Sequence, residues 1–200
     1  MLKPILYVIA GCNGSGKSSF SNALTPKNTL PYDYDLVFLS KFKSLIDTEL
    51  RDRMAHNLSM EDLKLNIETA INGRLNFCYE TNFNSTPLYW PKIFKQADYR
   101  IELAFFCLDS IEKAKERVRI RVENGGHFVP DAEIEDRYKL GFQNLNEHWV
   151  FFDSIHLFET SKYNSPPKHL LTIEQNKVIV LDDFPDYLDV LTPSIANRLK

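Results

Sequence analysis

Short apolar runs alternate along the chain with segments whose apolar residues recur at helical spacing. Five of these runs predict buried parallel β-strands, at residues 5–10, 36–39, 75–79, 101–108 and 155–158. Two further runs predict a terminal β-hairpin, because only Glu-Gln-Asn-Lys separates residues 170–173 from residues 178–181. This succession of strands and helices indicates an α/β fold.

The first helices are delimited by their capping residues. One helix is expected to start at Ser18, directly after a glycine-rich stretch. A second is expected to open at a capping-box sequence that begins with Ser59, and to close at Gly73. Pro87 suits the first position of a third helix, which we expect to run to about Ala97.

Two longer helices are predicted in the second half of the chain. Asp109 and Ser110 are expected to cap a basic helix that stops before the pair Gly125-Gly126. Pro130 is expected to open the next helix. Its apolar residues fall on one face, which comprises Ile134, Tyr138, Phe142, Leu145 and Trp149.

The order of these elements predicts a specific α/β arrangement. We expect a P-loop NTPase-type, three-layer αβα fold with a mostly parallel, roughly five-stranded sheet and a C-terminal β-hairpin. No internal repeat or low-complexity linker divides the chain. In such sheets, ligands bind beyond the carboxyl ends of the strands, so polar residues that adjoin the predicted strands are the candidates for a site.

The strongest candidate is a glycine loop between the first strand and the first helix. Residues 11–18 read G-C-N-G-S-G-K-S and match the phosphate-binding pattern G-x-x-x-x-G-K-[ST] in the context that the pattern requires. Its backbone N–H groups would surround a phosphate, Lys17 would reach the β- and γ-phosphates, and Ser18 would ligate Mg²⁺. The predicted nucleotide-binding residues are Gly11, Asn13, Gly14, Ser15, Gly16, Lys17, Ser18 and Ser19.

Carboxylates next to the predicted strands are candidates for the acceptor side of a phosphoryl transfer. Asp33 and Asp35 both fit a catalytic base, and Asp35 is favoured because it abuts the apolar run 36–39, although an Asx-turn is the structural alternative. Glu80 and Thr81 follow the next strand, where Glu80 suits a substrate hydroxyl, a metal-bound water or a helix cap. Asp109 is assigned to capping rather than to a metal.

Arginines on the basic helix suggest a mobile lid. Arg117 and Arg121 are four residues apart and share a helix face close to Gly125-Gly126, and Arg137 lies on the helix that follows. Arginines that close over a triphosphate supply charge to the transition state. His127 is either a structural residue or a general base.

Composition narrows the class of protein. The chain has 200 residues and a net charge of −3, with a pI near 6.0, which argues against nucleic-acid binding over the whole surface. Its three cysteines lack metal-ligand spacing and are expected to be buried thiols in a reducing compartment. The N-terminal apolar run is too short for a membrane span, so we expect a cytoplasmic protein without a membrane partner.

Several segments together resemble the zeta toxin family of P-loop kinases. They are the glycine loop with its flanks, Tyr79-Glu80-Thr81, residues 117–130 with the sequence Gly-Gly-His-Phe-Val-Pro at their end, and Ile134-Glu-Asp-Arg137-Tyr138. The departures are Cys12, where a proline is common, and Asp33-Tyr-Asp35, where relatives carry Asn-x-Asp.

The resemblance implies a function and the residues that serve it. It implies an ATP-dependent kinase with Mg²⁺, GTP being the other nucleotide considered, which phosphorylates a hydroxyl of a nucleotide sugar such as UDP-N-acetylglucosamine. Lys17 would bind phosphate, Asp35 would be the base, and Glu80 and Thr81 would touch the acceptor together with Asp33. Arg121 and Arg137 would be the lid arginines.

The resemblance also suggests a domain boundary and a partner. Residues 1–165 would form the kinase domain, and residues 166–200 a hairpin and tail appended to it. The partners would be a small-molecule hydroxyl acceptor and an antitoxin protein encoded elsewhere. Nucleic acid is not expected.

Other functions are distinguished by specific sequence features. A GTPase switch requires Asn-Lys-x-Asp, whereas the chain offers only Asn176-Lys177-Val178-Ile179. A polynucleotide kinase requires a basic, aromatic groove for the strand, and an acidic pI disfavours it. A kinase for another small metabolite and a non-catalytic ATP-binding regulator remain alternatives.

Overall fold

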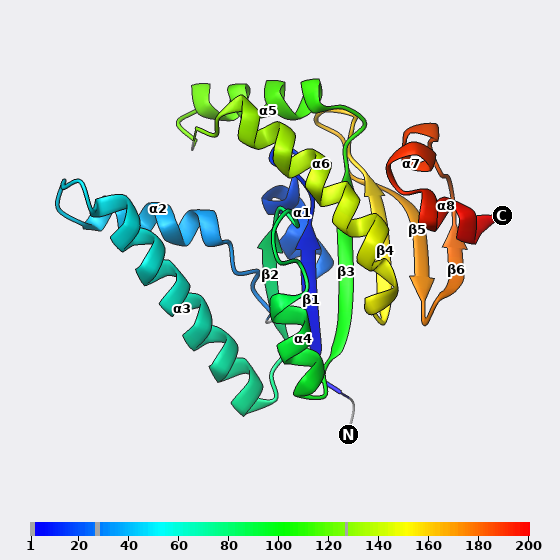
Figure 1. The fold of residues 1–200 in the computed structure, drawn as a ribbon, viewed down its shortest axis with the longest axis horizontal. Helices are drawn as coiled ribbons and strands as arrows, with labels where there is room; N and C mark the ends of the chain where they lie inside the picture. Colours follow the sequence, from blue (N-terminus) through cyan, green and yellow to red (C-terminus); the bar gives the residue numbers. More distant parts are fainter. Residues whose placement is uncertain (1–2, 27–28, 127) are drawn as a thin grey trace.

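The chain forms one mixed sheet with helices on both of its faces (Figure 1). We describe a computed structural model, which covers residues 3–26, 29–126 and 128–200. The sheet has six strands in the order β2-β1-β3-β4-β5-β6. Four are parallel, namely β1 (Ile5–Ala10), β2 (Phe77–Thr81), β3 (Arg100–Cys107) and β4 (Ser154–Glu159). This arrangement confirms the predicted fold class.

The predicted hairpin is confirmed, and it extends the parallel sheet. Strands β5 (Lys168–Glu174) and β6 (Lys177–Leu181) pair antiparallel with each other, and β5 pairs antiparallel with β4. Gln175 and Asn176 make the two-residue turn with φ of 47° and 62°, as such tight hairpin turns require. All six strands therefore belong to one sheet.

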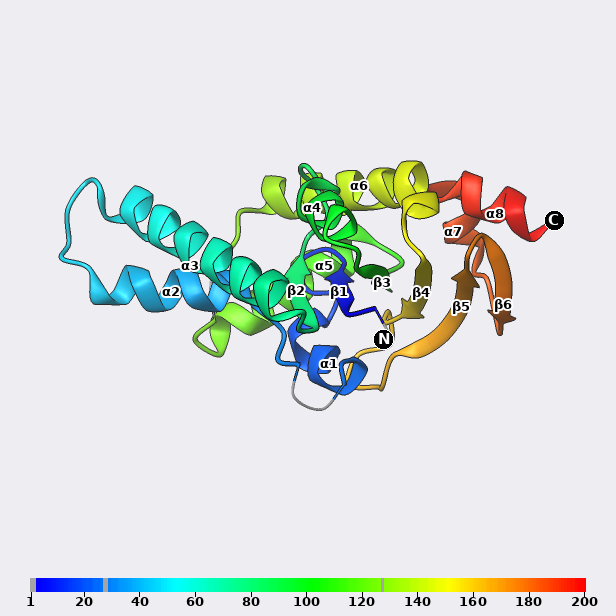
Figure 2. The same cartoon turned by 90° about the horizontal axis from the view of Figure 1, so that it is seen from below.

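Helices cover the two faces of the sheet unequally (Figure 2). The largest apolar core packs one face against α4 (Tyr89–Gln96), α6 (Asp131–His148), α7 (Asp186–Leu191) and α8 (Pro193–Leu199). A smaller cluster on the other face packs against α1 (Lys17–Leu24). A 3₁₀ turn, Trp149–Phe151, follows α6. Helices α7 and α8 were not predicted, and they bury Leu188 and Ile195 completely.

A pair of helices projects from the sheet as an arm (Figures 1 and 2). It consists of α2 (Tyr34–Ser44) and α3 (Arg51–Gly73), which pack against each other. The strand predicted at 36–39 is therefore wrong, because Asp33 Oδ1 accepts a hydrogen bond from Leu36 N at 3.1 Å and caps a helix there. Before this helix, Tyr32 forms an isolated parallel bridge to β2, through Tyr79.

Two predicted helix starts are also wrong. Helix α3 begins at Arg51, and Ser59 is an interior residue whose hydroxyl donates to the Ala55 carbonyl at 2.7 Å. Helix α4 begins at Tyr89 rather than at Pro87, because Thr86 has a φ of 40°. The closure of α3 at Gly73 is confirmed.

Two further predictions are confirmed, the cap at Ser110 and the burial of the cysteines. Ser110 caps α5 (Ile111–Glu123), because its hydroxyl accepts a hydrogen bond from Lys113 N. All three cysteines are buried free thiols. Within the described ranges, no helix combines the length and apolar character that a bilayer crossing requires. The boundary proposed at residue 165 stays a prediction.

Candidate active site

A cleft of about 700 Å³ opens at the carboxyl ends of the parallel strands. Its lining includes the glycine loop, the end of β2 with the segment that follows it, and the start of α2. Helix α5 and the segment after β4 complete it. The cleft therefore collects the residues that the sequence placed beyond different strands.

The backbone of the glycine loop requires glycine at several of its positions, of which Gly14 and Gly16 shape the phosphate site most directly. Gly16 has a φ of 90° and directly precedes α1, while Gly14 has a φ of 78°. A Cβ atom on Gly14 would lie 2.9 Å from the Ala114 carbonyl oxygen, so the loop packs against the backbone of α5. The loop is thus shaped by its neighbours as well as by its sequence.

The glycine loop has groups suited to hold a phosphate. Lys17 Nζ donates hydrogen bonds to the carbonyls of Gly11 at 2.6 Å and Cys12 at 3.0 Å, and to Asn82 Oδ1 at 3.1 Å. Desolvation lowers the pKa of Lys17. Ser15 Oγ is buried and has no hydrogen-bond partner within the described residues. With the N-terminus of α1 beside them, these groups fit the phosphates of a nucleotide.

Four oxygen-bearing side chains lie close together at the start of α1. Ser18 Oγ lies 2.6 Å from Glu80 Oε2 and 3.0 Å from Asp33 Oδ2, and Ser21 Oγ donates to Glu80 Oε1 at 2.7 Å. Burial raises the pKa of Glu80. The hydrogen bonds from Ser18 and Ser21 oppose this effect but do not outweigh it. Hydroxyl and carboxylate oxygens are the donors that Mg²⁺ prefers, so these residues fit that ion.

The metal would not be held by protein groups alone. Among the described residues, no cluster of three or more histidine, cysteine, aspartate or glutamate side chains could hold an ion. Ser18, Asp33 and Glu80 thus supply only part of a ligand set. Mg²⁺ commonly completes such a set with water and the phosphates of its nucleotide.

The two candidate bases occupy different environments. Asp33 is engaged at both oxygens, by the α2 cap and by Ser18. Asp35 lies in the first turn of α2, is exposed and lines the cleft, and its carboxylate makes no hydrogen bond in the part of the chain described. Thr81 also lines the cleft, and its Oγ1 accepts a hydrogen bond from Phe83 N at 3.0 Å.

The predicted lid arginines lie on two helices. Arg121 on α5 is exposed and lines the cleft. Arg137 on α6 donates to Asn13 Oδ1 of the glycine loop at 3.0 Å and pairs with Glu133 at 2.8 Å. His127 lies outside the described residues.

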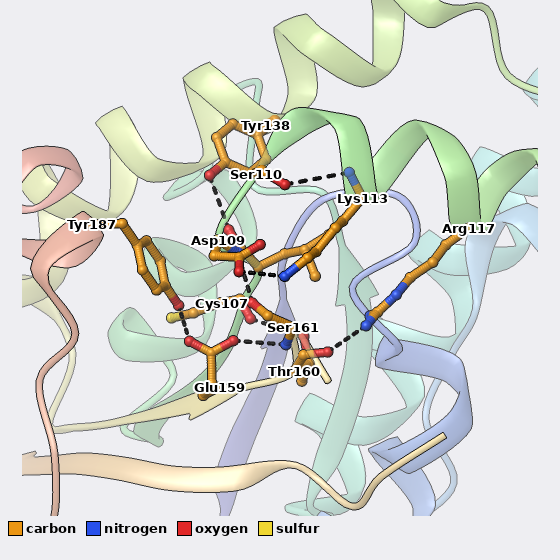
Figure 3. Close-up of polar contacts among 11 residues, drawn as sticks. Cys107, Asp109, Ser110, Lys113, Arg117, Tyr138, Glu159, Thr160, Ser161 and Tyr187 are labelled. Carbon is orange, nitrogen blue, oxygen red and sulfur yellow. Dashed lines mark hydrogen bonds and ion pairs between the residues drawn. The ribbon is translucent and has the colours of Figure 1, made fainter. Parts of the chain in front are cut away.

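Arg117 joins the glycine loop to the segment that follows β4, and Figure 3 shows its contact with Thr160. Its guanidinium donates to the Gly14 carbonyl at 3.1 Å and to the Thr160 carbonyl at 2.6 Å, and lies 5.6 Å from the Tyr163 ring centroid. The sequence indicated that Arg117 faces the same way as Arg121, but nothing in it revealed the two carbonyl partners. Arg117 is therefore a positioning residue for the loop.

A polar network holds the segment that Arg117 contacts (Figure 3). Tyr187 of α7 donates a hydrogen bond to Glu159, whose other oxygen accepts from Ser161 N at 2.7 Å. Ser161 Oγ in turn accepts from Asp109 N at 2.8 Å. Asp109 does not cap α5, as was expected, because its carboxylate pairs with Lys113 and Ser110 is the cap.

This fold, with a phosphate loop between a parallel strand and a helix, defines the class of P-loop kinase folds. Comparison with protein families identifies the family within that class. The Zeta toxin model matches residues 1–153, and the chain belongs to this family. No curated protein sequence matched the chain significantly.

Solved structures share the fold at low sequence identity. A chain of the PezAT chromosomal toxin-antitoxin system of Streptococcus pneumoniae is 14% identical, with a TM-score of 0.58, over 100% of this chain and 89% of that one. A chain of the AvrRxo1-ORF1:-ORF2 complex with ATP is 11% identical, with a TM-score of 0.69. The match covers 96% of this chain and 64% of that one.

A third structure is the Pnkp1/Rnl/Hen1 RNA repair complex. One of its chains is 20% identical, with a TM-score of 0.56, over 74% of this chain and 47% of that one. This protein therefore spans about half of the RNA repair chain that it matches. At these identities the likenesses show the fold alone.

Proposed function

We propose that the protein is an ATP-dependent kinase that transfers the γ-phosphoryl group to a hydroxyl of a small molecule. The observation that carries the proposal is the meeting of Ser18 with Asp33 and Glu80 beside the phosphate loop, with Asp35 facing the same cleft. Membership of the zeta toxin family supports it. GTP is the second nucleotide that the loop itself would accept.

The glycine loop and α1 would bind the donor. Lys17 would exchange its carbonyl partners for phosphate oxygens, and Ser18, Asp33 and Glu80 would hold Mg²⁺. The bound ion would neutralise phosphate charge. Arg121 and Arg137 would add positive charge from the α5–α6 side, where Arg137 already contacts Asn13.

Asp35 would act as the base. It would accept the proton of the acceptor hydroxyl while that oxygen forms its bond to the γ-phosphorus, and the bond to the β,γ-bridging oxygen would break to release ADP. Asp33 is less suited to this role because both of its oxygens are engaged. Glu80 and Thr81 line the cleft beside Asp35, where they would touch the acceptor.

Two further parts of the proposal come from the family and its neighbours. A nucleotide sugar such as UDP-N-acetylglucosamine is the acceptor that the family suggests. An antitoxin protein is the partner that it suggests, since one neighbour is a chain of a toxin-antitoxin system. A polynucleotide acceptor is disfavoured by the net charge of −3 and by the carboxylates Asp33, Asp35 and Glu80 in the cleft.

The test measures ADP release from ATP with Mg²⁺ and a panel of hydroxyl acceptors. We expect acceptor-dependent ADP release that falls at least about 100-fold in Asp35→Asn, because proton transfer to a positioned side chain contributes about that much. Asp47→Asn is the matched control, since Asp47 is an exposed residue on the same arm and does not line the cleft. ATP binding without acceptor-dependent turnover would instead identify a nucleotide-binding regulator.

A further inference from the structure

The two outer strands of the sheet, β2 and β6, differ in how their outer edges are covered (Figure 1). At the β2 edge, the Tyr32 N–H donates to the Cys78 carbonyl at 2.9 Å, and the Tyr32 carbonyl accepts from Glu80 N at 3.0 Å. At the opposite edge, β6 pairs with β5 on one side. Within the described ranges, residues 177–181 make no backbone hydrogen bond beyond this pairing. The backbone groups of β6 that point away from β5 are thus open to a further strand.

The side chains of β6 leave this edge apolar. Residues 178–181 read Val-Ile-Val-Leu, and each of these side chains is between 38% and 56% exposed. Edge strands are commonly protected by charged residues or proline, but β6 contains no proline, and Lys177 at its start is its one charged residue. An irregularity in the pairing, opposite Thr172 and Ile173, bends the strand but leaves the apolar run exposed. Consecutive β-branched and apolar side chains of this kind suit pairing with another strand.

Charged residues of opposite sign lie at the two ends of the apolar run. Lys177 precedes it, and Asp182 and Asp183 follow it. All three are exposed, although Lys168 of β5 pairs with Asp182 at 3.6 Å and with Asp183 at 3.0 Å. A second strand of the same sequence that runs antiparallel to β6 would place its acids beside Lys177 and its lysine beside the two acids. A parallel copy would place like charges together, so the charges favour the antiparallel arrangement.

From these observations we infer that the β6 edge binds a second copy of this chain, and that the two β6 strands pair antiparallel across a twofold axis. The two sheets would then form one continuous sheet. Assembly would stop at two copies, because the hydrogen bonds of Tyr32 occupy the β2 edge. Residues 177–183 do not line the cleft, so this inference does not depend on the proposed function.

The expected dimer is weak, because two five-residue strands make a small interface. Stable complexes commonly bury about 1,200–2,000 Å², so we expect a dissociation constant of roughly 10–100 μM. Sedimentation equilibrium of the full chain, from about tenfold below to about tenfold above that range, measures it. The mass should rise from 23.3 kDa toward twice that value, and a single 23.3 kDa species throughout overturns the inference.

Hydrogen exchange tests whether β6 is the interface. The amide groups of residues 177–181 that point away from β5 should exchange readily in the monomer and gain protection at concentrations that favour the dimer. Residues 5–10, which form β1 in the middle of the sheet, are the internal reference and should not change. Protection that rises with concentration at another surface, without a change at residues 177–181, overturns the inference.

Exchanged charges test the antiparallel pairing. Lys177→Glu makes both ends of the apolar run acidic, whereas Asp182→Lys adds a cation and leaves the bond of Lys168 to Asp183 in place. Each variant alone should dimerise about 10-fold more weakly at low salt, because attractive exposed pairs become repulsive in both halves of the dimer. Lys64→Glu is the matched control, since Lys64 is exposed on α3, and its dimerisation should equal that of the wild type.

A mixture of the two variants gives the most specific result. In a heterodimer, the introduced glutamate would face the introduced lysine, and the native lysine would face the native acids. An equimolar mixture should therefore recover the wild-type affinity as a heterodimer, which native mass spectrometry identifies by its mass. This recovery would also show that both variants are folded. Homodimers of wild-type strength, or a mixture without preferred heterodimers, overturn the inference.

Discussion

The two walls of the cleft differ in how firmly their side chains are held. On the donor wall, which comprises residues 13–20, Arg117, Arg121, Thr160 and residues 162–165, Lys17 makes three hydrogen bonds and Arg117 bridges two carbonyls. The acceptor wall comprises residues 33–35, Met60, Leu63, residues 79–82, residues 84–87 and Trp90. Its Asp33, Glu80 and Thr81 are hydrogen-bonded, whereas Asp35 and Trp90 make no side-chain hydrogen bond within the described residues. The donor wall is thus preorganised for one ligand, whereas Asp35 and Trp90 leave their polar groups to the substrate, where specificity can arise.

The largest effect is expected at the centre of the donor wall. Lys17→Ala should lower kcat/KM for ATP by about 100- to 1,000-fold, because it removes positive charge aimed at the transferred phosphate. Steady-state ADP release measures this. Lys139→Ala is the control, since Lys139 is exposed on α6 and pairs with Glu135 outside the cleft. A loss below about 10-fold would contradict the role of Lys17 in the donor wall.

The next largest effect is expected when Arg117, which connects the glycine loop to Thr160, is replaced. Arg117→Ala should weaken ATP binding by about 10-fold or more, because hydrogen bonds from a charged group are worth about 1.5–3 kcal/mol. Arg117→Lys should rescue little, since one ammonium does not reproduce a fork that reaches both Gly14 and Thr160. Calorimetric titration with a non-hydrolysable ATP analogue measures both variants. Full rescue by lysine would show that only the charge matters.

A smaller effect is expected from outside the cleft. Tyr187→Phe keeps the ring but removes the hydroxyl that donates to Glu159, so it should lower the free energy of unfolding by about 1–2 kcal/mol. It should also weaken ATP binding by about 2- to 5-fold, within the range of indirect couplings. Urea unfolding and the same calorimetric titration measure the two effects. A loss of stability with unchanged ATP affinity would show that the hydrogen bonds around Glu159 do not influence nucleotide binding.

The smallest effect concerns Glu80, the acid of the acceptor wall that Ser18 of the donor wall contacts. Because burial raises the folded-state pKa of Glu80, this group favours the fold below its unfolded pKa and loses that contribution as pH rises through the folded value. Glu80→Gln stays neutral, so without ligands it should gain stability relative to the wild type between about pH 4 and pH 7. Urea unfolding at each pH measures the difference in free energy of unfolding between the variant and the wild type. A difference that does not change with pH would contradict the raised pKa of Glu80.

The glycine loop of the donor wall was predictable from the sequence. The glycine pattern depends on local backbone geometry, so its context of strand and helix could be read from neighbouring residues. The acceptor wall was harder, because short apolar runs do not distinguish a strand from a helix. The run 36–39 was assigned to a strand, whereas the cap at Asp33 makes it helical and presents Asp35 from a helix end.

Other parts of the site depend on contacts distant in the chain. The bonds of Arg117 to Gly14 and Thr160 span 103 and 43 residues, and neither leaves a local pattern. Trp90 was also missed, because no local pattern shows that it lines a cleft built from segments distant in the chain. Helices α7 and α8 are short, so periodicity gave too weak a signal to predict them.

The contact between Tyr187 and Glu159 has a consequence for the order in which the molecule is completed during synthesis. The ribosome delivers the glycine loop about 145 residues before the Thr160 carbonyl that anchors Arg117 and about 170 residues before Tyr187, which fixes that segment, an interval on the order of ten seconds or more at ordinary rates of translation. A nascent chain therefore exposes the phosphate loop well before it can be held in shape. ATP binding should accordingly appear late, after α7 has been made.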